Sequence, residues 1–179
     1  MNIIKLLSIA ALSLGLTGHN PYHEVIIRTD DGGAVSLMTT KYYHKRATDI
    51  LLTKTNAEGN EEWFKTYGGT SYDKSSDLIA TNDGGYAILG STSSYGNGNY
   101  DIYLIKVDKK GKKQWSKTYG GFYNEYGYSI KERKNGDFVI QATGQGCFNW
   151  SGAPNCDGEK WQFRVDNKGK ELGQLEVAK

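Results

Sequence analysis

The sequence is poor in the residues on which most catalytic and metal sites depend. Its 179 residues include three histidines and two cysteines, and they contain no Gly-x-Ser-x-Gly, His-Glu-x-x-His or phosphate-loop motif. His19 and His23 precede the repeated part of the chain, and the neighbours of His44 are Lys45 and Arg46, which would repel a metal ion. We therefore expect no metal or cofactor, and the sequence favours a non-enzymatic protein.

The chain also lacks an excess of charge of one sign. Its 22 lysines and arginines stand against 20 acidic residues, for a formal net charge of +2. A balance this small gives no electrostatic reason to expect nucleic acid or an anionic membrane surface as a partner.

Long apolar runs are missing except at the N-terminus. A short positive segment ending at Lys5 precedes the apolar run Leu6–Leu16, which is too short to span a bilayer. This pattern predicts a secretory signal peptide over residues 1–18, followed by a short linker over residues 19–23. We therefore expect an extracytoplasmic protein, whether periplasmic, secreted or at the cell surface, with no transmembrane span in the mature chain.

The end of the predicted signal peptide is similar to a lipoprotein processing site. Leu16, Thr17 and Gly18 match the first three residues of a bacterial lipobox, but His19 occupies the position of the acylated cysteine. Either signal peptidase cleaves near Gly18, or the natural protein carries a cysteine at position 19. A lipid anchor is doubtful because acylation requires the thiol.

The sequence contains two cysteines, so a single disulfide is the most that it could form within the chain. Cys147 and Cys156 could form a disulfide in an oxidising compartment, which would contribute roughly 2–3 kcal/mol of stability by restricting the unfolded chain. We expect this disulfide, and two free thiols are the alternative.

What the sequence does contain is a repeat of about 52 residues. The copies cover about residues 24–75, 76–127 and 128–179 and form one domain, residues 24–179. The third copy includes an insertion, in which both cysteines lie. The repeated segments are Asp31–Gly33, Asp83–Gly85 and Asn135–Asp137, together with Trp63–Gly69 and Trp115–Gly121.

Each copy divides into four apolar-rich runs bounded by turn residues. Glycine in the two short connections supplies the positive φ that tight hairpins need, and Tyr86–Leu89 is apolar on both faces, which is typical of a sheet packed on both sides. The pattern predicts an all-β fold of three four-stranded antiparallel sheets. In the second copy the runs are Asp77–Thr81, Tyr86–Thr92, Asp101–Asp108 and Lys113–Tyr119.

The segments Asp83–Thr92, Tyr100–Asp108 and Gln114–Gly121 resemble the β-propeller repeats of bacterial and archaeal surface and secreted proteins, and the seven-bladed propeller repeat family in particular. The resemblance extends over residues 24–179. It implies four-stranded blades around an axis and a role in binding or adhesion, and it brings no catalytic motif.

The number of copies departs from that family. Propellers usually close with four to eight blades, and Gly173 stands where the third copy would carry the equivalent of Trp115. Two chains could pair as a homodimer into a six-bladed ring, or the chain could be a fragment of a longer propeller or an open stack of three blades. The fourth alternative is a β-trefoil, since three repeats of four strands also fit that fold.

The longer connections carry most of the aromatic residues and should share one edge of the sheets, because successive connections in a meander leave at alternate edges. Variable loops on a repeated scaffold usually carry recognition, and tyrosine and tryptophan suit contact with a protein or a glycan. The alternative is that these rings only cover the blade ends. The predicted binding residues are Tyr42, Tyr43, His44, Arg46, Tyr72, Tyr95, Tyr100, Tyr123, Tyr126, Phe148 and Trp150.

Other repeated residues have structural explanations. Asp49, Asp101 and Glu159 share a repeat position, which could form a ring of carboxylates, but we expect each to begin a strand and cap a loop. Trp63 and Trp115 should pack between blades.

These observations predict an exported binding or scaffolding module of the cell envelope, with a protein or glycan ligand. The alternatives are a half-propeller that assembles with itself, or a hydrolase or lyase with a site on the propeller axis.

Overall fold

The computed structural model describes residues 24–40, 47–145 and 160–175. The predicted signal peptide, the linker and the two cysteines lie outside these residues. No helix in the described ranges is long and apolar enough to cross a membrane.

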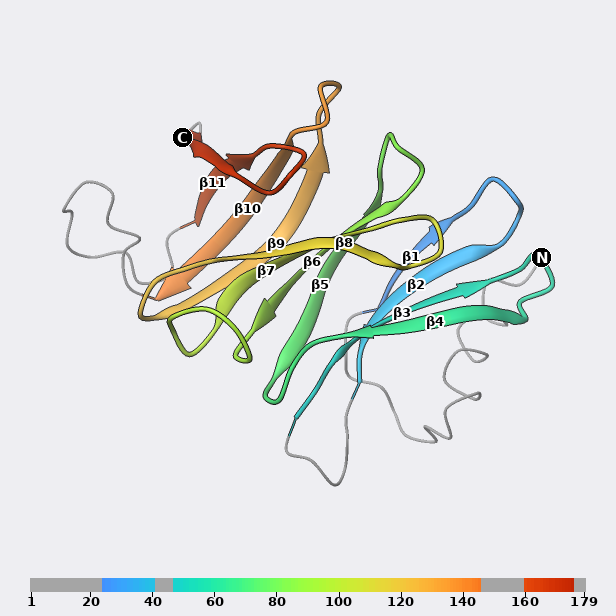
Figure 1. Ribbon diagram of the computed structural model, residues 1–179, viewed down its shortest axis with the longest axis horizontal. Coiled ribbons are helices and arrows are strands. Elements are labelled where there is room, and N and C mark those ends of the chain that lie inside the picture. The colour runs from blue at the N-terminus through green and yellow to red at the C-terminus, as the bar shows by residue number, and fades with distance from the viewer. Residues whose placement is uncertain (1–23, 41–46, 146–159, 176–179) are drawn as a thin grey trace.

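The described residues form three separate four-stranded antiparallel sheets, each an up-and-down meander, which we call blades 1, 2 and 3 (Figure 1). Three four-stranded repeats were predicted, and the structure confirms them. Because each repeat builds its own sheet, the trefoil alternative is not adopted. Blade 1 contains β1 (Val25–Arg28), β2 (Ala34–Thr39), β3 (Ile50–Thr55) and β4 (Glu61–Tyr67); blade 2 contains β5 (Asp73–Ala80), β6 (Tyr86–Thr92), β7 (Asp101–Val107) and β8 (Lys113–Tyr119); blade 3 contains β9 (Asn124–Glu132), β10 (Phe138–Gln145), β11 (Lys160–Val165) and β12 (Glu171–Leu175).

The first strand of blade 2 is longer than the sequence predicted. β5 begins at Asp73, four residues before the expected start at Asp77, and its register with β6 shifts between Ser75 and Asp77. The added segment pairs with the preceding blade, since the N–H of Asp73 donates to the carbonyl of Thr48 at 2.8 Å. This contact between blades has no local sequence signal, which is why the start was misplaced.

The carboxylate of Asp83 holds the Asp-Gly-Gly turn of blade 2 together through hydrogen bonds. It accepts the N–H of Gly85 at 3.1 Å and the ammonium of Lys106, which is 5% exposed, at 2.8 Å. Partial burial raises the pKa of Asp83, but the hydrogen bonds from Lys106, Thr81 and Gly85 outweigh it and lower the pKa to about 2. Hairpin chemistry, as predicted, explains this aspartate.

Blade 2 packs between the other two blades, and Figure 1 shows the three sheets side by side in chain order. One face of blade 2 presents Ile88 and Ile105 to a core shared with blade 1, and the other presents Leu89 and Leu104 to a core shared with blade 3. The prediction of a sheet buried on both faces is therefore confirmed for this blade. Trp63 and Trp115 pack against these two cores, as predicted.

The face of blade 3 that is turned away from blade 2 has a different character. Gln141 and Gln162 occupy the repeat positions of Leu89 and Leu104, and neither glutamine is fully buried. The apolar contact that joins the blades is therefore not continued on this face.

Candidate functional site

The longer connections that the structure describes, β4–β5, β6–β7 and β8–β9, lie at one edge of the sheets, opposite the hairpin turns β1–β2, β5–β6 and β9–β10 (Figure 1). Tyr72, Tyr95, Tyr100, Tyr123 and Tyr126 lie in or next to these loops. The structure therefore brings together those predicted binding residues that it describes. The other six predicted residues lie outside the described part of the chain: Tyr42, Tyr43, His44, Arg46, Phe148 and Trp150.

The β6–β7 loop lies directly on the β8–β9 loop. A Cβ atom added to Gly98 would lie 2.3 Å from the carbonyl oxygen of Tyr123, so only glycine allows this approach. The rings of Tyr100 and Tyr126 are 5.6 Å apart, and the ammonium of Lys74 lies 4.7 Å above the Tyr100 ring in a cation–π contact. Part of the aromatic set thus connects blades 2 and 3.

Tyr95 makes the equivalent connection between blades 1 and 2. Its hydroxyl donates to the carbonyl of Gly68 at 2.7 Å, and its ring lies 5.5 Å from that of Tyr103. Burial, together with the nearby carboxylates of Asp73 and Asp49, raises the pKa of the Tyr95 hydroxyl. The ring remains 44% exposed, so Tyr95 contributes both to packing and to the surface.

Phe122 and Tyr123 are the most exposed aromatic residues of the described chain, at 85% and 60%. Tyr123 was predicted as a binding residue, whereas Phe122 was missed. A signal for it exists in the repeat, because the first copy has Thr70 and Ser71 at the same two positions. The blade scaffold therefore does not require aromatic rings here, and a large apolar side chain in water usually marks a contact surface.

Two pairs of carboxylates lie behind this edge, one at each junction between blades. A Cβ on Gly120 would lie 2.2 Å from Asp101 Oδ1 and 2.6 Å from Glu125 Oε2, which places these two oxygens within about 5 Å of each other. Asp101 and Glu125 are 2% and 1% exposed. At the first junction, Gly68 has the same relation to Asp49 and Asp73.

The carboxylates hold the loops in place. Glu125 accepts the N–H of Gly121 at 3.0 Å, Asp73 accepts that of Gly69 at 2.8 Å, and Asp101 accepts that of Gly98 at 3.2 Å. Asp101 begins β7 and caps a loop, which confirms the prediction for this residue. Glu125 was missed. The repeat offered a signal for it, because an acidic residue stands four positions after the second glycine of each Tyr-Gly-Gly, Asp73 in the first copy and Glu125 in the second.

Burial dominates the electrostatics of the second pair. It raises the pKa of Asp101, partly offset by hydrogen bonds from Gly98 and Asn97. Burial also raises the pKa of Glu125, and the charge of Asp101 adds to the effect. Among the described residues no group of three or more histidine, cysteine or acidic side chains could hold a metal ion. The hydrogen bonds that Glu125, Asp73 and Asp101 accept support the Tyr-Gly-Gly turns and the β6–β7 loop.

No protein-family model matches the chain, and comparison with curated proteins gave no match.

Proposed function

We propose that this chain is an extracytoplasmic, non-enzymatic binding module of the propeller-repeat type, which recognises a protein or a glycan through its aromatic loop edge. The observation that carries the proposal is the pair Phe122 and Tyr123, which is exposed at 85% and 60% and replaces two small polar residues of the first repeat. Exposed rings on loops offer large contact area at a low entropy cost.

The support beneath these rings favours recognition. Gly121, the residue before Phe122, is held by Glu125, and the carbonyl of Tyr123 lies against Gly98 of the neighbouring loop. A loop that is ordered before binding loses less conformational entropy when the ligand arrives. The polar face of blade 3 does not support the alternative in which two chains complete a ring through that face.

The proposal is tested with Phe122→Ala on a glycan array and in pull-downs with chemical cross-linking. The matched control is Phe64→Ala, which removes a ring that is 47% exposed on β4, outside the loop edge. We expect the Phe122 variant to bind its ligand about tenfold more weakly or worse, as central aromatic residues of interfaces do, while the control binds as the wild type. The proposal would be contradicted if the folded protein bound no ligand in either assay, or if the two variants bound equally well.

A further inference from the structure

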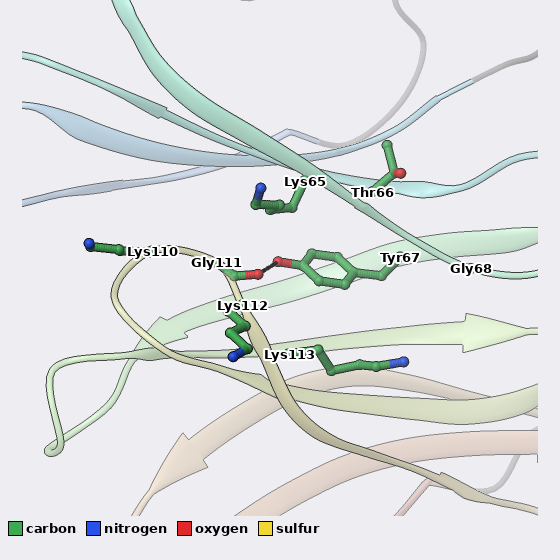
Figure 2. Close-up of a pocket in the computed structure, with 8 residues that line it drawn as sticks. All are labelled: Lys65, Thr66, Tyr67, Gly68, Lys110, Gly111, Lys112 and Lys113. Atoms are coloured by element: carbon green, nitrogen blue, oxygen red, sulfur yellow. Dashed lines mark hydrogen bonds between the residues drawn. The ribbon is translucent and has the colours of Figure 1, made fainter.

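A second surface feature is a basic pocket at the junction of blades 1 and 2 (Figure 2). The pocket is open to solvent and has a volume of about 510 Å³. The end of β4 forms one wall, and the β7–β8 turn with the start of β8 forms the other. Its lining residues are Lys65, Thr66, Tyr67, Gly68, Lys110, Gly111, Lys112 and Lys113.

Contacts between the blades fix the two walls relative to each other. The buried hydroxyl of Tyr67 donates to the carbonyl of Gly111 at 2.6 Å. Gly111 has a φ of 72°, and a Cβ there would lie 2.8 Å from the ring of Trp63 and 2.9 Å from Lys65 Cγ. Figure 2 shows Lys65 on one side of the Tyr67–Gly111 hydrogen bond and Lys112 and Lys113 on the other. The lysines are thus carried by two walls that contact each other directly.

Within the described part of the chain none of the four lysines of the pocket forms an ion pair, and the carboxylate of Asp108 interacts electrostatically with Lys110 and Lys112. The buried ammoniums of Lys54 and Lys106, by contrast, each pair with a carboxylate. Asp108 is the acidic residue of the turn, and its Oδ1 accepts the N–H groups of Lys110 and Lys112 at 2.8 and 2.9 Å. The pocket therefore keeps an excess of positive charge.

The same arrangement recurs at the next junction. The hydroxyl of Tyr119 donates to the carbonyl of Gly169 at 2.8 Å, and Lys117, Lys168 and Lys170 occupy the positions of Lys65, Lys110 and Lys112. Glu171 replaces the fourth lysine, so the second site carries less positive charge. The two basic sites therefore lie at successive junctions, the first between blades 1 and 2 and the second between blades 2 and 3. Packed sheets lie about 10 Å apart, which sets the scale of the spacing between the sites.

We propose that this surface binds a linear acidic polysaccharide, with one carboxylate or sulfate group in the pocket and a later one at the second site. Two charged sites repeated at the spacing of the blades suit a polymer whose acidic groups also repeat. A single-stranded nucleic acid would need exposed rings for base stacking beside the charged groove. Among the described residues that line the pocket, Tyr67 is the single aromatic one, and it is 7% exposed.

The test is isothermal titration with polygalacturonate and heparin oligosaccharides of two lengths, on the wild type and on Lys65→Ala/Lys112→Ala. The matched control is Lys131→Ala/Lys134→Ala, which removes two exposed lysines of blade 3 that do not line the pocket. At low ionic strength we expect binding to weaken about three- to tenfold in the pocket variant, and less than about twofold in the control. Lys117→Ala should weaken the longer oligosaccharides more than the shorter ones.

Several results would overturn this inference. They are the absence of binding to either polymer, equal losses in the pocket and control variants, and tighter binding of a single-stranded oligonucleotide of matched charge. If Lys117→Ala weakens both lengths equally, the two-site arrangement is wrong. Lysine-to-glutamine versions replace any alanine variant whose unfolding midpoint shifts. Phe122→Ala should leave this binding unchanged, which separates the two surfaces experimentally.

Discussion

Replacing Gly120 with alanine tests whether the carboxylate pair at the second junction is what requires glycine in the Tyr-Gly-Gly motif. The new Cβ would lie 2.2 Å from Asp101 Oδ1 and 2.6 Å from Glu125 Oε2, distances that no real side chain tolerates. Overpacking of this kind costs about 1–3 kcal/mol. Moving Glu125 also weakens its bond from the N–H of Gly121, and hydrogen bonds to charged groups contribute about 1.5–3 kcal/mol. Since the two effects overlap, we expect the free energy of unfolding to fall by about 3 kcal/mol.

Gly121→Ala is the matched control, because the same substitution one residue later meets no atom within 4 Å. It keeps the N–H that Glu125 accepts. We expect its free energy of unfolding to stay within about 1 kcal/mol of the wild type, since alanine at a compatible site mainly restricts the unfolded chain.

Urea unfolding followed by tryptophan fluorescence and by circular dichroism measures both variants. Trp115 and Trp161 pack against the core shared by blades 2 and 3 and Trp63 packs against the core shared by blades 1 and 2, so fluorescence reports on both junctions. Equal transitions by the two probes and unchanged m-values would justify a two-state treatment. Equal stability of the Gly120 and Gly121 variants would refute the steric argument for the motif.

Two further predictions concern the same junction. Burial raises the pKa of Asp101 and of Glu125, so the folded protein binds their protons more tightly than the unfolded chain does. The stability that these protonated groups contribute is fully present below the ordinary carboxyl pKa, about 4, and is lost as the pH rises through their raised pKa values. Asp101→Asn should therefore lose less stability than the wild type between about pH 4 and pH 7 in urea titrations, and a larger loss would contradict the assignment. Tyr119→Phe removes the hydroxyl that donates to the buried carbonyl of Gly169 and should lower the midpoint of thermal unfolding, at a cost of about 1–2 kcal/mol. Tyr128→Phe, on a ring that is 40% exposed, should have almost no effect, and similar losses in both would show that the hydrogen bond is unimportant.

The strands and turns of this protein could be predicted because their signals are local. The Asp-Gly-Gly and Lys-Gly-Lys segments place glycine where the hairpins need positive φ, as at Gly84 and Gly111. The apolar run Tyr86–Leu89 predicted that the middle sheet is buried on both faces, and the two cores of the structure confirm it. Each of these features depends on neighbours a few residues away in the chain.

The candidate site was predicted only in part. The gathering of tyrosines at one edge followed from the alternation of connections in a meander, without knowledge of any contact. Which rings pack and which face solvent could not be predicted in this way. Tyr100 joins Tyr126 across a junction, whereas Phe122 projects into water, and no local pattern distinguishes the two situations.

By itself, the sequence determined the repeat, the four strands of each copy and the edge at which the aromatic loops meet, since periodicity and turn residues act at short range. Only the tertiary structure decided what the Tyr-Gly-Gly motif does. Its tyrosine reaches the turn of the next blade, its first glycine makes room for two carboxylates, and the N–H of its second glycine donates to one of them. These partners lie on different strands and blades, so their contacts exist only once the sheets have packed together.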